Sequence, residues 1–392
     1  RRIADVRDLG ARGGRLRVAT LQSIRSTSVE HRMKWFIAII SALALMALAQ
    51  ATGLPLECGQ KIIGQPVSLP LPAVVTGRVG FYAARYSDNI LIPSSIVTLG
   101  DSSSVFPTAS AYKTLVVHEA LRGVDRGMFK LKQLFETTPA NQSIERYPRG
   151  FNTLEVLADR TIRLSDNTAS DLLHRAVGPA ALARYAKSKS SCTNVLLTSK
   201  AWWAAQGGLL PQILGDDLYS GAQSYAALEF ENRIDLAARL NAAAKTVTAA
   251  SIEKAIDTYF QGNTYTTDLE LMLQNTTTPQ AFSNLMAQVM PAKNLQPATR
   301  KLFRRIMSTG CCYAKKSLVT STYRAAKAGS GWRILTLTGY LELSNKESIA
   351  YAYFNDESET FESEVIEKQI RAVSLWIDQV ILGIADQKNA IR

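Results

Sequence analysis

The first candidate for chemistry in this 392-residue sequence is a serine with a lysine three residues later, Ser110 and Lys113. A helix that begins here places the hydroxyl and the amine on one face, within reach of each other. A desolvated lysine near other cations has a lowered pKa and can accept the serine proton as the hydroxyl attacks a carbonyl carbon. The pattern alone is weak, because Ser251 and Lys254 share the spacing and have no partner motif downstream.

The second candidate is the tripeptide Ser165-Asp166-Asn167. The Ser165 hydroxyl can relay a proton, and the Asn167 carboxamide can both donate and accept hydrogen bonds at a bound substrate. We expect Asp166 to brace the loop. The alternative is a helix start, because Ser, Asp and Asn are all favoured as N-caps.

The third candidate is Lys327-Ala328-Gly329-Ser330-Gly331, just before a strand predicted from Arg333 to Leu343. Lys327 can hold an anionic substrate, and the glycines permit close backbone approach. The alternative is a turn with a solvated lysine.

In this order, the three motifs resemble the S-x-x-K, S-D-N and K-T-G signature of class A β-lactamases and penicillin-binding proteins. Phe106-Pro107, Thr168-Ala169 and the run from Thr276 to Pro279 also look like that family, and the similarity covers about 76–190 and 276–385. The resemblance implies an α+β fold and a serine hydrolase that forms an acyl-enzyme without a cofactor.

The resemblance also implies a role for each matching residue. The expected roles are nucleophile (Ser110), proton transfer (Lys113, Ser165) and substrate binding (Asn167, Lys327, Gly329, Ser330). The backbone N–H groups of Ser110 and Ser330 are expected to form the oxyanion hole. Losing such a donor costs about 3–4 kcal/mol of barrier.

One departure from the family lies in the third motif, where Ala328 replaces a threonine or serine. The missing hydroxyl normally helps bind the substrate carboxylate, and a charge-assisted hydrogen bond of this kind is worth about 1.5–3 kcal/mol. The Ser330 hydroxyl is a candidate substitute.

A second departure concerns deacylation. Class A β-lactamases carry a Glu-x-x-Leu-Asn loop whose glutamate activates water, and the sequence has no match to it. A long insertion, about 199–275, occupies its place, and Asn275 stands where the family usually has aspartate. We expect efficient acylation. The residue that activates the deacylating water stays open, with insertion carboxylates among the candidates.

The expected elements place the first two motifs at helix starts. Strands are predicted at 80–85 and 96–100, joined by a polar turn. A helix follows Ser110, with Tyr112, Leu115, Val116 and Ala120 at helical spacing. Another helix is predicted over 153–162, with a break at 164–167 and a resumption through Leu172-Leu173.

The second half of the chain predicts helices followed by strands. The insertion is expected to form a helical hairpin, and a helix is expected after Pro279. Strands are predicted at 334–343 and 348–354, and the apolar spacing from Val365 to Ile384 predicts a final helix. The fold is therefore expected to be α+β: N- and C-terminal strands form one antiparallel sheet covered by helices, beside a mainly helical lobe.

The net charge of +12 raises the question of nucleic-acid binding. Nine basic and three acidic residues in 1–51 account for half of it, and the remainder shows no Lys/Arg stripe with interleaved aromatics. We expect no nucleic-acid partner. The expected partner is a small β-lactam or a cell-wall peptide-like acyl substrate, bound by a monomer.

The segment from Met33 to Ala51 has the charged start, apolar stretch and small-residue cleavage site of a secretory signal. Its apolar run is shorter than the ~20 residues needed to span a bilayer, which disfavours a membrane anchor. We therefore expect a periplasmic or secreted hydrolase domain over 52–392. Residues 1–32 precede a plausible start methionine and are expected to be a non-native extension.

The cysteines and histidines bear on two other possibilities, disulfide bonds and a metal site. Cys58, Cys192, Cys311 and Cys312 can form up to two disulfides or stay as buried thiols, and the adjacent pair is expected not to bridge to itself easily. None has metal-site spacing. A zinc hydrolase would lack ligands, because only His118 and His174 would survive processing, so no metal is expected.

The leading functional hypothesis is a β-lactamase-like hydrolase acting through Ser110. A cell-wall D,D-peptidase or esterase with the same acylation machinery is the enzymatic alternative. A slowly deacylating penicillin-binding sensor, or a pseudo-enzyme, is the alternative outside catalysis.

Overall fold

The computed structural model describes residues 64–87, 91–262, 265–314 and 316–385. The predicted upstream extension (1–32), the signal segment (33–51) and Cys58 lie outside the described residues.

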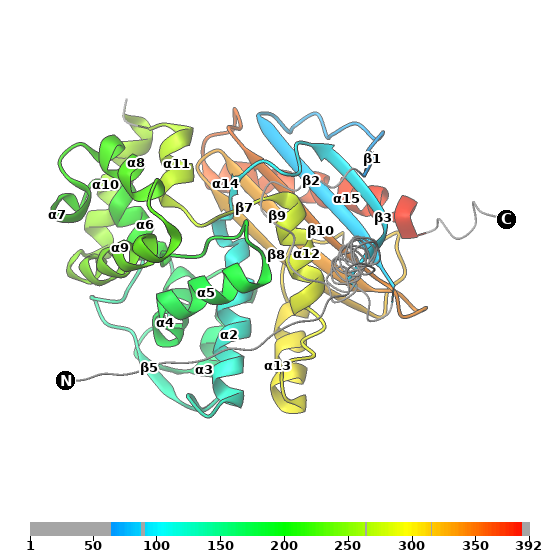
Figure 1. The fold of residues 1–392 in the computed structure, drawn as a ribbon, viewed down its shortest axis with the longest axis horizontal. Coiled ribbons are helices and arrows are strands. Elements are labelled where there is room, and N and C mark those ends of the chain that lie inside the picture. Colours follow the sequence, from blue (N-terminus) through cyan, green and yellow to red (C-terminus); the bar gives the residue numbers. More distant parts are fainter. Residues whose placement is uncertain (1–63, 88–90, 263–264, 315, 386–392) are drawn as a thin grey trace, which may run out of the picture. The chain divides into compact units, whose positions relative to one another are not determined.

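The described part contains one large sheet of six strands in the order β1-β3-β2-β10-β9-β8. The strands are β1 (Gln65–Pro66), β2 (Arg78–Tyr86), β3 (Pro93–Gly100), β8 (Tyr323–Gly331), β9 (Ile334–Glu342) and β10 (Ser348–Asp356). β10 pairs antiparallel with both β2 and β9, so the N-terminal and C-terminal strands meet in the middle of the sheet (Figure 1). β1 alone runs parallel, to β3. The predicted antiparallel sheet of N- and C-terminal strands is confirmed, and β8 forms one edge.

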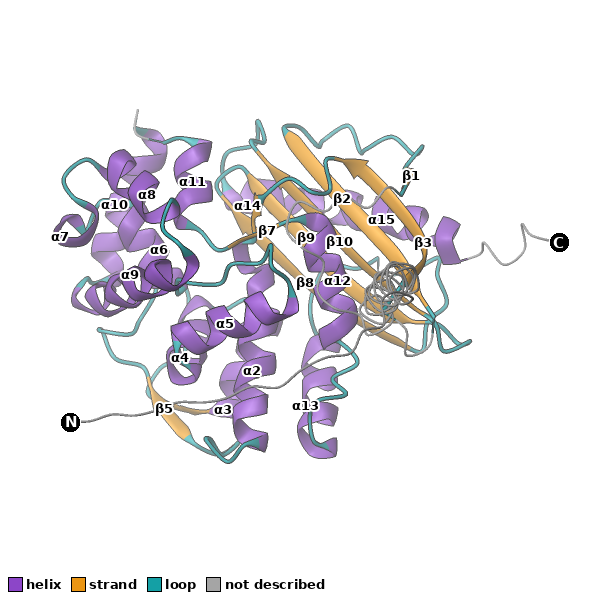
Figure 2. Cartoon of the chain, viewed as in Figure 1, coloured by secondary structure: helices purple, strands orange, loops and turns teal. Residues whose placement is uncertain are grey.

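Both faces of the sheet are apolar because helices cover both. In β2, Phe81 and Ala83 belong to one hydrophobic cluster and Tyr82 belongs to the other, as the alternation of side chains along a strand requires. Phe81 packs edge-on against Trp376 of α15 (Ile370–Ala385), with 5.0 Å between the ring centroids. The other cluster, which contains Tyr82, also contains Phe282 of α12 (Pro279–Val289). Figure 2 shows α12 lying across the sheet.

A mainly helical lobe lies beside the sheet (Figure 1). Of its four helices next to the first two motifs, the first follows Ser110 as predicted, the second spans nearly the predicted 153–162, the third begins at the predicted break, and the fourth was not predicted. They are α2 (Lys113–Asp125), α3 (Leu154–Arg163), α4 (Asn167–Val177) and α5 (Pro179–Lys189). Other elements are β4 (Phe106–Pro107), η1 (Ala109–Tyr112), β5 (Leu134–Glu136), β6 (Phe151–Thr153), η2 (Ala244–Thr246), β7 (Thr276–Thr277), α13 (Pro297–Ser308), α14 (Ser363–Ile366) and η3 (Glu367–Gln369).

The hairpin predicted for 199–275 is wrong, because this segment contains six α-helices in its described part. They are α6 (Ser199–Gln206), α7 (Pro211–Leu214), α8 (Leu218–Ala226), α9 (Phe230–Ala243), α10 (Ala249–Gln261) and α11 (Thr267–Leu273). Gly208 and Gly215, at φ +68° and +82°, interrupt the chain with conformations that favour glycine. Apolar residues at roughly helical intervals in this segment are nevertheless largely in the core: Ile234, Leu240, Ile252, Ile256 and Tyr259 are buried.

The two ends of this segment are joined by a neutral side chain. The Asn275 carboxamide oxygen accepts hydrogen bonds from the backbone N–H groups of Leu196 (2.8 Å) and Leu197 (3.1 Å), and its Nδ2 donates to the Leu197 carbonyl (2.9 Å). Asn194 and Thr276 form a β-bridge beside it. The carboxamide that replaces the aspartate of the resembled family therefore closes the segment through backbone contacts.

Cys311 and Cys312 are bridged to each other, with 3.7 Å between their Cα atoms. This corrects the expectation that adjacent cysteines do not readily bridge. The turn reaches this geometry with Cys312 at φ +90°. Cys192 is also disulfide-bonded, so the thiol alternative is wrong for the three described cysteines.

Among the described residues, no helix combines the length and the hydropathy required to cross a membrane.

Candidate active site

The predicted nucleophile lies at the start of a buried helix. Ser110 belongs to η1, which leads directly into α2, and its helical neighbours Ala109, Ala111 and Tyr112 are all buried, whereas Ser110 is partly exposed. Ala109 has φ +41°, a conformation that non-glycine residues rarely adopt. The turn therefore presents Ser110 to solvent from an otherwise buried segment.

Gly329 brings the third motif against this turn. A Cβ atom at position 329 would lie 2.3 Å from the Ser110 nitrogen and 2.8 Å from the Ala109 Cβ, so only glycine fits there. The predicted close backbone approach is confirmed. Contrary to the alternative of a turn with a solvated lysine, this motif forms the end of edge strand β8.

The Lys113 amine joins the first motif to the second. Lys113 is fully buried, and its Nζ donates to the Ser165 carbonyl oxygen and the Asn167 Oδ1, each at 2.6 Å. A longer hydrogen bond, 3.4 Å, reaches the Ser165 Oγ. No described hydrogen bond joins Lys113 to Ser110, which lies one helical turn before it.

The Lys327 amine joins the third motif to the second. Lys327 is buried, and its Nζ donates to the Ser165 Oγ at 2.9 Å and to the Ala328 carbonyl oxygen. The Ser165 hydroxyl thus lies between two buried amines. A hydroxyl in this place can take a proton from one partner and give it to another.

Burial shifts the titration of both amines. Loss of solvent lowers the pKa of Lys113 to about 8, although Glu145, Asp171 and Asp166 oppose the shift. Burial and the Lys113 charge lower the pKa of Lys327 well below its usual range. At pKa 8, about a tenth of Lys113 is neutral at pH 7 and can accept a proton.

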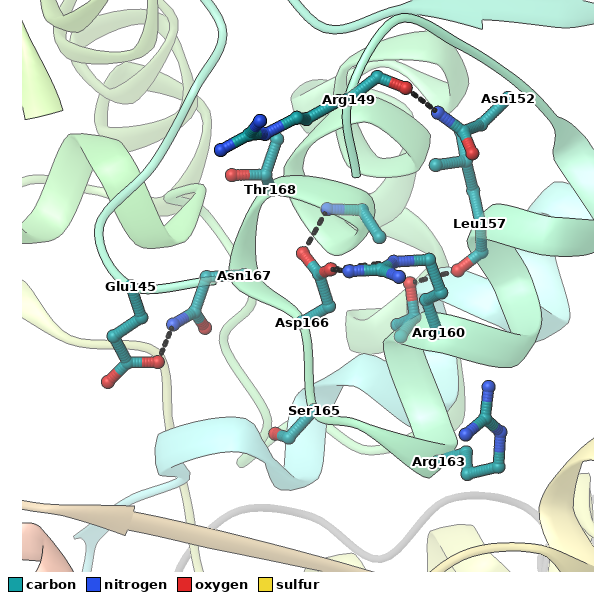
Figure 3. Close-up of polar contacts among 12 residues, drawn as sticks. Glu145, Arg149, Asn152, Leu157, Arg160, Arg163, Ser165, Asp166, Asn167 and Thr168 are labelled. Atoms are coloured by element: carbon teal, nitrogen blue, oxygen red, sulfur yellow. Dashed lines mark hydrogen bonds and ion pairs between the residues drawn. The ribbon is translucent and has the colours of Figure 1, made fainter. Parts of the chain in front are cut away.

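Asp166 has the bracing role predicted for it. Its Oδ2 accepts hydrogen bonds from the Arg160 Nε (2.8 Å) and Nη2 (2.6 Å), and its Oδ1 accepts from the Ala169 N–H at 2.9 Å (Figure 3). The second contact is an N-cap of α4. The alternative interpretation of this tripeptide as a helix start is therefore also correct, because Asp166 caps α4. Ser165 and Asn167 contact the lysines instead.

Glu145 is a residue of the site that the sequence did not reveal. Asn167 Nδ2 donates to the Glu145 Oε2 at 2.9 Å, and Figure 3 shows the two side chains facing each other. The Glu145 N–H donates to the Glu253 Oε1 of α10 at 3.3 Å. Burial raises the pKa of the Glu145 carboxyl, although the Lys113 ammonium opposes this shift.

The insertion supplies no carboxylate to the lysine network. Among the described residues of 199–275, none forms a hydrogen bond with the side chains of Lys113, Ser165 or Asn167. The buried Glu270 carboxylate accepts from the Gln274 side chain, and burial raises its pKa to about 8. Glu253 reaches the site only through the backbone of Glu145.

A cavity of about 1010 Å³ opens beside Ser165 and β8. Its lining includes Ser165 and the whole stretch from Lys327 to Ser330, whereas Ser110, Lys113 and Asn167 are not part of it. The Ser330 Oγ donates to the Glu367 Oε1 at 2.5 Å. The cavity can therefore take the part of a substrate that extends past Ser165.

No group of three or more His, Cys, Asp or Glu side chains in the described part has the arrangement of a metal site. His118 and His174 are fully buried, and burial lowers the pKa of each to about 3. The Tyr185 hydroxyl lies 2.7 Å from the His118 Nδ1.

Comparison with known proteins identifies the family. A family model described as the β-lactamase enzyme family matches residues 97–380. The chain is also similar to solved structures of a β-lactamase from Burkholderia vietnamiensis, the putative class A β-lactamase PenP from Rhodopseudomonas palustris and a class A β-lactamase from Mycobacterium abscessus. In that order, the sequence identities are 18%, 16% and 18%. The matches cover 77%, 79% and 79% of this chain, and 91%, 94% and 94% of the respective solved chains. The TM-score is 0.49 in each case. No curated protein matches the chain.

Proposed function

The chain belongs to the β-lactamase enzyme family, and on this premise we propose that it is a serine hydrolase that opens a β-lactam or a related acyl substrate through an acyl-enzyme on Ser110. The position of the Ser165 hydroxyl between the amines of Lys113 and Lys327 carries this proposal. The three sequence motifs that supply these groups are far apart in the chain and meet at one site.

Acylation uses the Lys113 amine and the backbone N–H groups beside Gly329. Neutral Lys113 takes the Ser110 proton as the Oγ adds to the carbonyl carbon. The N–H groups of Ser110 and Ser330 belong to segments in direct contact at Gly329, and they would hold the oxyanion. When the carbon–nitrogen bond breaks, the proton passes from Lys113 through the Ser165 hydroxyl to the leaving nitrogen.

Deacylation needs a base for water, and Glu145 is the candidate that the geometry favours. Among the described residues, two carboxylates from outside the motifs contact motif side chains, Glu145 on Asn167 and Glu367 on Ser330. Glu145 is the largest charge influence on Lys113, whereas Glu367 acts on Lys327. Glu145 is an exposed residue, but loss of solvent around its carboxyl raises the pKa, which makes the carboxylate a better proton acceptor near neutral pH.

A chromogenic cephalosporin tests the β-lactamase proposal. We expect turnover that Ser110→Ala abolishes. Absence of turnover at every substrate concentration overturns it. A penicillin that labels Ser110 stoichiometrically and leaves slowly would favour the D,D-peptidase, esterase or sensor alternatives, and an intact mass without any adduct would favour a pseudo-enzyme.

We also propose that the protein is periplasmic or secreted after cleavage between Ala51 and Thr52. The disulfides at Cys192 and at Cys311–Cys312 support an oxidising compartment, because cytosolic thiols are normally kept reduced. Expression from Met33, followed by cell fractionation and N-terminal sequencing, tests this. Uncleaved protein in the cytosol would contradict it.

A further inference from the structure

The cavity beside Ser165 extends beyond the three motifs. Its far wall is formed by the loop that carries the Cys311–Cys312 disulfide and by the segment that leads into α15. This wall contributes three cations that belong to none of the motifs: Lys316, Lys368 and Arg371. All three side chains are exposed, so a ligand entering from solvent can reach them.

The charges that line this cavity are strongly unbalanced. Five cationic side chains line it, and Glu367 is the only carboxylate in the described lining. Arg163 is paired with Asp159 at 2.9 Å, but no described residue forms an ion pair with any of the three far-wall cations. Positive charges gathered in a concave surface focus the field and raise the local concentration of anions.

The wall that carries these cations is held in place. Ser374 of α15 donates through its Oγ to the Cys312 carbonyl oxygen at 3.1 Å, on one side of Lys316. On the other side, Asp378 of α15 accepts a hydrogen bond of 2.5 Å from the Ser317 hydroxyl and another from the Leu318 N–H. Lys316 therefore projects from a loop anchored to α15 at both ends, and such preorganisation reduces the entropic cost of binding.

The motif residues set the direction in which a substrate enters. Ser165 and Lys327 line the cavity, whereas Ser110 and Asn167 do not. If Ser165 delivers the proton to the leaving group, the leaving group lies on the cavity side and the acyl group lies on the Asn167 side. Lys327 already donates to Ser165 and to the Ala328 carbonyl, and Ala328 offers no hydroxyl. A second anionic group on a substrate would therefore require further cations.

We infer that the cavity is a leaving-group subsite selective for polyanionic leaving groups, with one anionic group near Lys327 and a second held by Lys316, Lys368 and Arg371. This inference rests on the proposed acyl transfer to Ser110 and names the substrate class for it. An acyl compound whose leaving part carries two carboxylates fits this arrangement better than one that carries a single carboxylate.

A series of three aryl esters tests the inference. All share a phenylacetylglycyl acyl group, and the leaving groups are phenol, 3-hydroxybenzoate and 5-hydroxyisophthalate, with no, one and two carboxylates. The values of kcat/KM are normalised to hydroxide hydrolysis. We expect the wild type to prefer the dianionic ester over the monoanionic ester by about tenfold or more, an advantage that falls with added salt.

The neutralising variant Lys316→Gln/Lys368→Gln/Arg371→Gln should lose the preference for the dianionic ester because its KM for that ester increases. Its kcat/KM for the uncharged phenyl ester should stay unchanged. Arg239→Gln/Lys245→Gln, two exposed cations of the helical segment, is the matched control and should keep the preference. A preference that survives in the triple variant, or that is absent in the wild type, overturns the inference.

Direct binding separates failure of the inference from failure of the proposed function. Calorimetric titration with 5-hydroxyisophthalate should show binding to the wild type and at least tenfold weaker binding to the triple variant. If no ester acylates Ser110, the proposed function fails, and this titration still decides whether the cavity binds a dianion. Equal affinities for the two proteins overturn the inference. Circular dichroism of the triple variant confirms that it is folded.

Discussion

The Lys327 amine donates a 2.9 Å hydrogen bond to the Ser165 hydroxyl across 162 residues of sequence. The same hydroxyl lies 3.4 Å from the Lys113 amine, so it connects the two amines by hydrogen bonds. In the proposed mechanism, a proton taken from Ser110 reaches the leaving group through the Ser165 side chain.

Ser165→Ala should lower kcat/KM for a chromogenic cephalosporin by about 10²–10⁴-fold, the usual contribution of a positioned proton donor. The fold should persist, because the two short hydrogen bonds of Lys113 go to the Ser165 carbonyl oxygen and the Asn167 Oδ1, which the substitution retains. Steady-state kinetics with a thermal melt measures both. Ser251→Ala is the control, since Ser251 shares the spacing to a lysine but lies outside the site, and it should leave the kinetics unchanged. Wild-type rates in Ser165→Ala would contradict the relay.

Glu145→Gln should slow deacylation while acylation continues. Glutamine retains an oxygen that can accept the Asn167 hydrogen bond, but it cannot take a proton from water. We expect the acyl-enzyme to accumulate, with hydrolysis reduced by about 10²–10⁴-fold and the acylation rate within about tenfold of the wild type. Stopped-flow kinetics and intact-mass spectrometry follow the two steps.

The matched control for Glu145→Gln is Glu253→Gln, because Glu253 contacts only the backbone N–H of Glu145. This control should turn over normally. If Glu145→Gln clears its adduct as fast as the wild type, Glu145 is not the base. If it loses acylation instead, its role is to position Asn167.

The sequence predicted the parts of the site that depend on local periodicity and motif order. Helical spacing after Ser110 identified α2, and the break before Asn167 identified the boundary between α3 and α4. Gly329 was expected to allow close approach, and its contact with the Ser110 nitrogen has that geometry. In each case, residues close together in the sequence are the physical cause of the local structure.

Other features depend on tertiary packing that no local pattern encodes. Glu145 is a single carboxylate in a loop with φ +67°, and its contact with Asn167 is created by the packing of that loop. The helical segment was predicted as a hairpin because apolar periodicity reveals buried faces better than it reveals where short helices end. The Cys311–Cys312 bridge likewise depends on a backbone conformation at Cys312 that the sequence does not specify.

Gly329→Ala should separate β8 from the nucleophile. The new methyl group would lie 2.3 Å from the Ser110 nitrogen, which belongs to backbone and cannot rotate away. We expect acylation to fall by about 10²-fold, because small displacements of reacting groups are costly, and the free energy of unfolding to fall by about 1–3 kcal/mol. Gly331→Ala is the control, since its methyl group would meet only the Ile334 side chain at 3.7 Å. Equal acylation rates in the two variants would contradict this.

Acylation should depend on pH through Lys113. Its pKa in the folded protein is lowered to about 8 by burial, so the neutral, proton-accepting amine increases as the pH rises from 7 to 9. Single-turnover acylation rates should rise across that range with an apparent pKa near 8, and Lys113→Ala should remove both the rate and the pH dependence.

The lowered pKa of Lys113 also predicts that the free energy of unfolding increases as the pH rises from about 8 towards the unfolded pKa of ~10.4. The reason is that the lysine keeps its proton in the unfolded chain in that interval but loses it in the folded protein. Denaturant titrations of wild type and Lys113→Met at pH 8 and pH 10 test this. A flat acylation profile, together with an equal pH response of stability in both proteins, would show that Lys113 does not titrate in this range.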